Sequence, residues 1–98
     1  MKQTYSQLVT EQARLVILRV LTELNGYTSN NSIITDLLKA WGVQLSHDQT
    51  KTQLRWLEEQ GLVTIEDING VLIATLTERG EDVANGFATV DGVKRPRA

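Results

Sequence analysis

The sequence predicts an α+β domain in which three helices form the core, a β-hairpin covers one end and a short helix follows. Apolar residues recur at helical spacing up to Gly61, and after it an extended pattern rich in β-branched residues takes over. Asn69-Gly70 interrupts this extended pattern. Asn-Gly is the strongest short hairpin signal, because both central positions of a type I′ turn require a positive φ.

Composition narrows the class of protein. A chain of 98 residues is enough for one domain with one small core. No apolar run approaches the roughly 18–20 residues of a membrane span, and the first residues do not lead into an apolar signal region, so we expect a cytoplasmic protein. The absence of cysteine excludes disulfides and thiolate metal sites. The net charge of −2 is unusual for a DNA-binding domain, which is usually basic.

The first two helices are predicted from their apolar faces. The first runs from about residue 6 or 10 to Asn25, and the second covers about residues 32–41, with Trp41 expected in the core. Residues 27–31 between them have the composition of a polar turn. A short Gly-containing turn then joins the second helix to the third, which is a helix-turn-helix arrangement.

The third helix, 46–60, is the most informative element. Ser46 is a good N-cap, and Gln49 completes a capping box. One face is apolar or small: Thr50, Leu54 and Leu57. The opposite face is polar: His47, Gln49, Lys51, Thr52 and Arg55. Gly61 ends the helix, because glycine adopts the left-handed conformation without steric cost.

A β-hairpin and a short helix are predicted after Gly61. Residues 62–68 and 71–76 are the strands of the hairpin, and a capped short helix covers 78–85. We therefore expect one domain over 1–86 and a flexible basic tail over 87–98.

A second apolar surface is expected on the first helix. Leu15 and Leu18 lie away from its main apolar face, and Leu8 precedes them by two or three turns. These leucines predict either a homodimer contact or packing within the chain, under the N-terminal residues or the last helix.

Two motifs resemble known families. The pattern Ser46…Thr50…Leu54…Leu57-Glu58…Gly61-Leu62-Val63 resembles the recognition helix and first wing strand of MarR-type and ArsR-type regulators. Leu76-Thr77-Glu78-Arg79-Gly80 resembles the start of the helix after the wing in the same families. The resemblance covers about residues 8–86 and implies a winged helix-turn-helix fold, with a three-helix core and a two-stranded wing.

A narrower resemblance involves the wing and residues 90–96. Together they are similar to small ArsR-like proteins of Mu-like transposable phages, which implies a phage or prophage origin. The chain departs from the larger families in three ways. It has no cysteine and only His47 for metal sensing, its flanks are shorter than in MarR-type proteins, and Lys51 occupies a position that is often apolar.

The resemblance makes the outer face of helix 46–60 the candidate DNA-binding surface. In a major groove, arginine pairs with guanine and glutamine with adenine, so we expect Arg55, Gln49 and Lys51 to carry base or phosphate contacts. Ser46 and Thr52 are expected to hold phosphates, and His47 to contact a phosphate or base near the helix start. The alternative is a solvated polar face.

The charged residues outside this helix favour opposite conclusions about DNA binding. Lys94, Arg95 and Arg97 form a basic arm suited to phosphates or a minor groove, although a disordered solubilising tail has the same composition. Glu66 and Asp67 lie near the wing tip, where phosphates would repel them.

Two functions remain open from the sequence. The first is a sequence-specific, dimeric, phage-encoded transcriptional regulator that binds double-stranded DNA with helix 46–60. The alternative is a winged-helix protein–protein interaction module without DNA binding, which holds its partner through the acidic wing and Trp56. No catalytic constellation, metal-ligand set or cofactor motif is recognisable, so we expect neither enzyme activity nor a cofactor.

Overall fold

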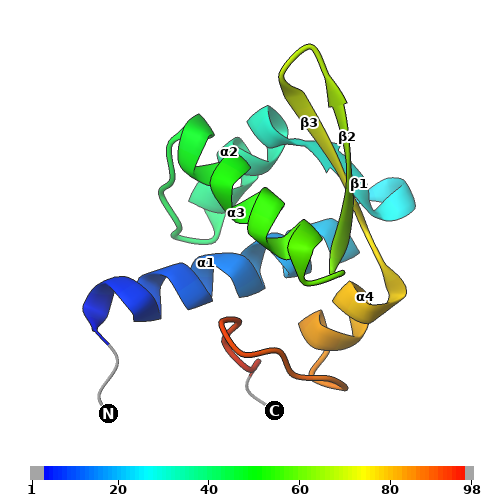
Figure 1. Ribbon diagram of the computed structural model, residues 1–98. Helices are drawn as coiled ribbons and strands as arrows, with labels where there is room; N and C mark the ends of the chain where they lie inside the picture. Colours follow the sequence, from blue (N-terminus) through cyan, green and yellow to red (C-terminus); the bar gives the residue numbers. More distant parts are fainter. Residues whose placement is uncertain (1–3, 97–98) are drawn as a thin grey trace.

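The computed structural model describes residues 4–96 and shows a winged helix (Figure 1). Its elements are α1 Tyr5–Thr22, the 3-10 turn η1 Asn25–Tyr27, β1 Thr28–Asn30, α2 Asn31–Ala40, α3 His47–Glu59, β2 Val63–Ile68, β3 Val71–Leu76 and α4 Glu78–Ala84. The predicted fold class and the order of three helices, a hairpin and a helix are confirmed. Within residues 4–96, no helix is both long enough and apolar enough to cross a membrane.

The wing is the hairpin of β2 and β3, which pair in antiparallel register with Ile68 opposite Val71. Asn69 and Gly70 both have positive φ, as the predicted turn requires. The short strand β1 joins the other edge of β3, so the sheet order is β1-β3-β2. We expected a polar turn there, because three polar residues contain no strand signal of their own and acquire strand geometry only by pairing with β3.

The core surrounds α1, which contacts α2, β3 and α4. Leu15 and Leu18, which we placed at a second surface, are 3% and 0% exposed and belong to this core. They cannot contact a second subunit, because neighbouring elements of the same chain cover α1 on several sides. Of the three predicted leucines, Leu8 alone remains exposed.

The end of α2 differs from the prediction. Trp41, expected in the core, is 42% exposed, because it is the C-cap and α2 has already ended at Ala40. Gly42 follows with a φ of +79°, and Val43 is buried instead. The Val43 amide donates to the Leu38 carbonyl at 2.9 Å, which closes the helix.

Two buried threonines join α2 to α3. The Oγ1 atoms of Thr35 and Thr50 lie 2.7 Å apart, and both residues are almost completely buried. Thr35 Oγ1 also lies 2.6 Å from the Asn31 carbonyl, and Thr50 Oγ1 lies 3.1 Å from the Ser46 carbonyl. Every buried side-chain polar atom in the described part of the chain has a hydrogen-bond partner, so this polar contact inside the core is satisfied.

The motif that resembles the start of the helix after the wing has a clear structural role. Thr77 caps α4 by accepting from the Gly80 amide, and its own hydroxyl donates to the Gly61 carbonyl at 2.7 Å. The Thr77 amide donates to the Leu62 carbonyl. A Cβ atom at Gly80 would collide with the Leu62 carbonyl oxygen and lie 2.7 Å from Leu76 Cδ1. Glycine is needed here for close approach, not for an unusual φ.

Gly80→Ala therefore tests this contact. In an open helix, replacing glycine by alanine stabilises by up to about 1 kcal/mol. Here we expect destabilisation by about 1–3 kcal/mol, because the added methyl group overpacks a backbone contact. Urea unfolding measures the change, with Arg79→Ala at an exposed position of α4 as a control expected within about 0.5 kcal/mol of the parent. A more stable Gly80→Ala variant would contradict the close packing.

Candidate nucleic-acid interface

The capping box at the start of α3 forms as predicted. The Gln49 amide donates to Ser46 Oγ at 3.1 Å, and the Ser46 amide donates to Gln49 Oε1 at 2.8 Å. This use of Oε1 has a consequence for DNA reading. Glutamine pairs with adenine through both its oxygen and its nitrogen, so Gln49 cannot make that paired contact while it caps the helix.

The outer face of α3 is open to solvent. Thr50, Leu54 and Leu57 are buried beneath the helix. The candidate residues on the other side are exposed except for half-buried Lys51: Ser46, His47, Gln49, Lys51, Thr52 and Arg55. No other described element of this chain covers the N-terminal half of that face.

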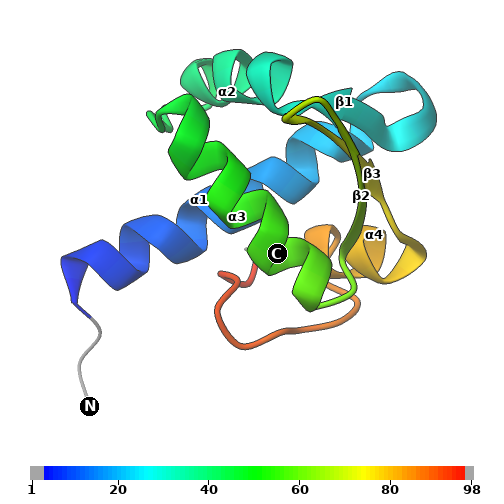
Figure 2. The ribbon, with the colours of Figure 1, turned by 45° about the horizontal axis from the view of Figure 1, so that its top comes forward.

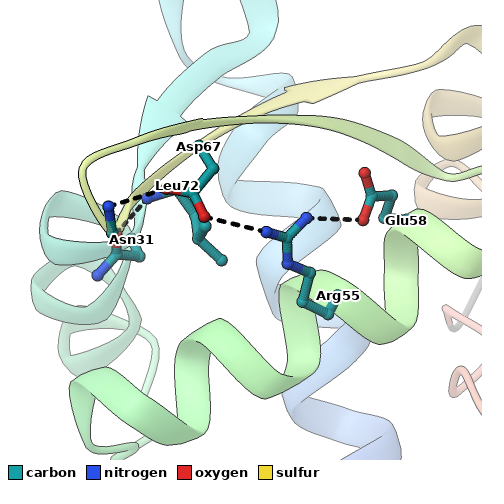
Figure 3. Close-up of polar contacts among 6 residues, drawn as sticks. Asn31, Arg55, Glu58, Asp67 and Leu72 are labelled. Carbon is teal, nitrogen blue, oxygen red and sulfur yellow. Dashed lines mark hydrogen bonds and ion pairs between the residues drawn. The ribbon is translucent and has the colours of Figure 1, made fainter.

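Arg55 is tied to acidic groups. Its guanidinium lies 3.0 Å from Glu58 Oε1 on the same helix and 3.3 Å from Asp67 Oδ2 on the wing (Figure 3). The other oxygen of Asp67 accepts from the Gly70 amide at 2.8 Å. Arg55 therefore links α3 to the turn of the wing, and its hydrogen-bonding groups are partly occupied within the molecule.

A second contact holds the wing against α2. Asn31 Oδ1 accepts from the Leu72 amide at 2.9 Å in a buried position. β1 pairs with β3 only from Ile73 onward, so the Asn31 side chain continues the hydrogen bonding of β1 by one position. The wing is thus held by side chains from both helices of the helix-turn-helix unit.

The opposite flank of α3 contains a contact that the sequence analysis missed. The Arg14 guanidinium stacks on the Trp56 ring, 3.7 Å from its centroid. It also donates to Gln53 Oε1 at 2.8 Å and to the Gly92 carbonyl at 2.9 Å. Burial lowers the pKa of Arg14, and the nearby Glu11 carboxylate opposes that shift. The sequence gives no local pattern that predicts this contact, because the partners of Arg14 are distant from it in the sequence.

The C-terminal segment, residues 87–96, lies against the body of the protein. Val93 is buried, and the Lys94 amide donates to the Glu11 carbonyl of α1 at 3.3 Å. We predicted a flexible tail, whereas the described part of this segment is packed back onto α1 and α3 (Figure 2). Lys94 and Arg95 are exposed, and the predicted contact residue Arg97 lies outside the described residues.

The charges near α3 are unevenly distributed. The helix itself contains three carboxylates and two cations, and the wing contains two carboxylates and no cation. The carboxylates lie mainly in the C-terminal half of α3 and along β2. The N-terminal half, with Asp48 and Lys51, is balanced. The cations Lys94 and Arg95 belong to the C-terminal segment, whose Gly92 lies against Trp56 on the flank opposite the wing.

Solved structures share this fold. AbsC, a MarR family transcriptional regulator from Streptomyces coelicolor, is 23% identical with a TM-score of 0.60. The match covers 82% of this chain and 61% of AbsC, so the chain spans about three fifths of that regulator. RosR of H. salinarum is 22% identical with a TM-score of 0.62, covering 82% of this chain and 80% of RosR. These likenesses establish the winged-helix fold.

Comparison of the sequence identifies proteins that are more similar to this chain. No family model matches the chain. An uncharacterized protein of Haemophilus influenzae is 48% identical over 77 residues, which is 78% of this chain and 74% of that protein. The uncharacterized protein gp26 of Escherichia phage Mu is 50% identical over 92 residues, which is 94% of this chain and 95% of gp26. The chain therefore belongs to the family of phage Mu gp26.

Proposed function

We propose that this protein is a phage or prophage DNA-binding regulator that inserts the N-terminal half of α3 into a major groove. The observation that carries the proposal is the exposure of that half-helix, which neither the wing nor the C-terminal segment covers. Helix-turn-helix proteins contact base edges chiefly with the N-terminal residues of the recognition helix. Relatedness to a phage protein supports a role inside the cytoplasm of an infected or lysogenic bacterium.

The contacts divide among the exposed residues by their availability. Lys51 is assigned base or phosphate contacts, and Thr52 is assigned a contact with a base donor, since its hydroxyl proton goes to the Asp48 carbonyl. Ser46 and His47 are assigned phosphates at the helix start. Arg55, predicted to read bases, is assigned to the wing instead, because Glu58 and Asp67 hold its guanidinium. Gln49 is assigned to the helix cap.

The double variant Lys51→Ala with Thr52→Ala tests this assignment. We expect the affinity for a selected operator to fall about 5- to 150-fold, the effect of losing about 1–3 kcal/mol of base contacts. The melting temperature should change little, because both side chains are at least partly exposed. Lys39→Ala, which removes an exposed lysine from α2, is the matched control. Unchanged affinity in the double variant, measured by fluorescence anisotropy, would refute the assignment.

The acidic wing is proposed to lie near the DNA without binding it. Asp67→Asn keeps an oxygen for the Gly70 amide but removes the negative charge. We expect the affinity for duplex DNA to rise roughly fivefold at low salt, an effect of about 1 kcal/mol that salt screens. Glu78→Gln on α4 removes an equal charge elsewhere and should have little effect. Equal affinities for the two variants would place the wing away from the phosphates.

The acidic wing also favours a second candidate function, a protein-interaction module. Two carboxylates without a cation suit a basic protein partner as well as they oppose DNA. A salt titration of the parent protein with duplex DNA separates the two functions. A DNA-binding protein loses affinity steeply as salt rises, whereas an interaction module does not retain the duplex even in dilute buffer.

A homodimer is proposed through the N-terminal half of α1, which extends beyond the rest of the molecule (Figures 1 and 2). Tyr5, Leu8 and Val9 are exposed there, at 83%, 49% and 43%. In place of the buried Leu15 and Leu18, these residues would form the contact. A dimer would read two half-sites about one helical turn apart.

Leu8→Glu tests the dimer. We expect this variant to sediment as a monomer, because the contact would bury a carboxylate without a partner. Its melting temperature in dilute solution should resemble that of the parent monomer, since Leu8 is outside the core. Arg19→Glu, an exposed change farther along α1, is the control. A parent protein that is monomeric at high concentration would contradict the proposal.

A further inference from the structure

We infer that Lys94 and Arg95 form a fixed phosphate clamp on the flank of α3 opposite the wing, and that Arg14 is the positioning residue that holds the clamp in place. The inference rests on the proposed DNA binding and adds to it the backbone contact that the acidic wing cannot supply. The clamp would bind the sugar-phosphate backbone of duplex DNA without regard to sequence.

The first step concerns which cations are available for phosphates. Phosphate contacts supply much of the affinity of DNA-binding proteins. The wing contains no cation, and Arg55 is paired with two carboxylates. Lys94 and Arg95 are the only two adjacent cations in the sequence, and both are exposed. The largest local positive charge beside α3 is therefore on the C-terminal segment.

The second step concerns how firmly these cations are held. Gly92 is bound through its carbonyl to Arg14, Val93 is buried, and the Lys94 amide is bonded to α1. Gly92 has a φ of +97°, and a Cβ atom there would lie 2.7 Å from Trp56 and 3.0 Å from Arg14. The backbone is thus fixed up to Lys94. A preorganised contact loses less conformational entropy on binding than a free tail does.

The third step concerns position. Trp56 and Arg55 project from opposite flanks of α3, toward the C-terminal segment and the wing respectively. Lys94 and Arg95 also line a hollow of about 630 Å³ between the N-terminal half of α1 and Gln44, two residues before the cap of α3. A helix in a major groove has a phosphate backbone along each flank. Of the two phosphate backbones that border the groove, the clamp therefore faces the one on the side away from the wing.

The main experiment measures the affinity for a random-sequence DNA duplex over a range of salt concentrations. Lys94→Gln with Arg95→Gln should reduce the slope of log affinity against log salt by about 2, since each lost phosphate contact contributes about 0.9. The control Lys39→Gln with Arg79→Gln removes the same charge from α2 and α4, and its slope should match that of the parent.

A second pair of variants tests the positioning. Gly92→Ala should displace the segment and lower the slope, although it changes no charge. Gly61→Ala is the matched control, because Gly61 also has a positive φ but a Cβ atom there meets nothing within 4 Å. Arg14→Gln should lower the slope as Gly92→Ala does, and Arg14→Lys, which keeps a cation near Trp56, should recover part of it.

The outcomes separate the clamp from the proposed function. If the parent protein binds the duplex and the Lys94/Arg95 variant keeps the parental slope, the clamp is refuted while DNA binding stands. If Gly92→Ala and Arg14→Gln keep the parental slope, Arg14 has no positioning role. If the parent protein fails to bind the duplex even at low salt, the proposed function and the clamp are both refuted.

Discussion

Three side chains on one face of α3, Thr50, Leu54 and Leu57, are completely buried, and their burial decides which residues of the helix meet solvent. Turning the helix about its axis would expose the two leucines and break the buried contact between Thr50 and Thr35. Losing a buried leucine contact costs about 2–5 kcal/mol, and an unsatisfied buried hydroxyl costs about 1–3 kcal/mol more. The orientation of the outer face is therefore a property of the core.

The two flanks of α3 are attached by contacts of different strength. Arg55 and Asp67 join the wing through an exposed ion pair, a type of contact that contributes about 0.2–1 kcal/mol and weakens with salt. Arg14 of α1 stacks on Trp56 and donates to Gln53, both on α3, and a second hydrogen bond to the Gly92 carbonyl joins the C-terminal segment to this contact. The contact is stronger because it is partly buried and therefore partly shielded from water. The wing is therefore attached more weakly to α3 than the C-terminal segment is, and the backbone that carries Lys94 is held more rigidly than the wing tip.

The features that could be predicted are those whose signals are local. The capping box at Ser46, the turn at Asn69-Gly70 and the end of α3 at Gly61 each depend on a few neighbouring residues. The burial of Leu15, Leu18 and the exposure of Trp41 depend on which elements pack around a helix, and helical periodicity does not contain that information. The strand β1 also depends on a partner, β3, whose position is set by the fold.

The sequence predicts which face of α3 forms the candidate site, but it does not predict which side chains on that face are already bound within the protein. Arg55 and Gln49 have side chains suited to reading bases, and both are on the expected face. Their partners, Asp67 across the chain and Ser46 at the cap, occupy groups that DNA reading would need. The contact of Arg14 with Trp56 joins residues from α1 and α3, so no local pattern indicated it.

In the proposed DNA complex, the net charge of −2 would affect how the duplex is oriented on the protein more than whether it binds. Asp67 acts within the fold, where it holds the wing turn and binds Arg55, so part of its charge is neutralised before any DNA approaches. Among residues 4–96, no cation forms an ion pair with Glu59 or Glu66. A duplex lying along all of α3 would bring phosphates toward these two carboxylates. Repulsion at that end and attraction at Lys94 and Arg95 together favour a duplex tilted toward the start of α3 and the C-terminal segment. In the proposed DNA complex the acidic residues would therefore set the docking direction, since they penalise the alternative in which the wing enters a groove.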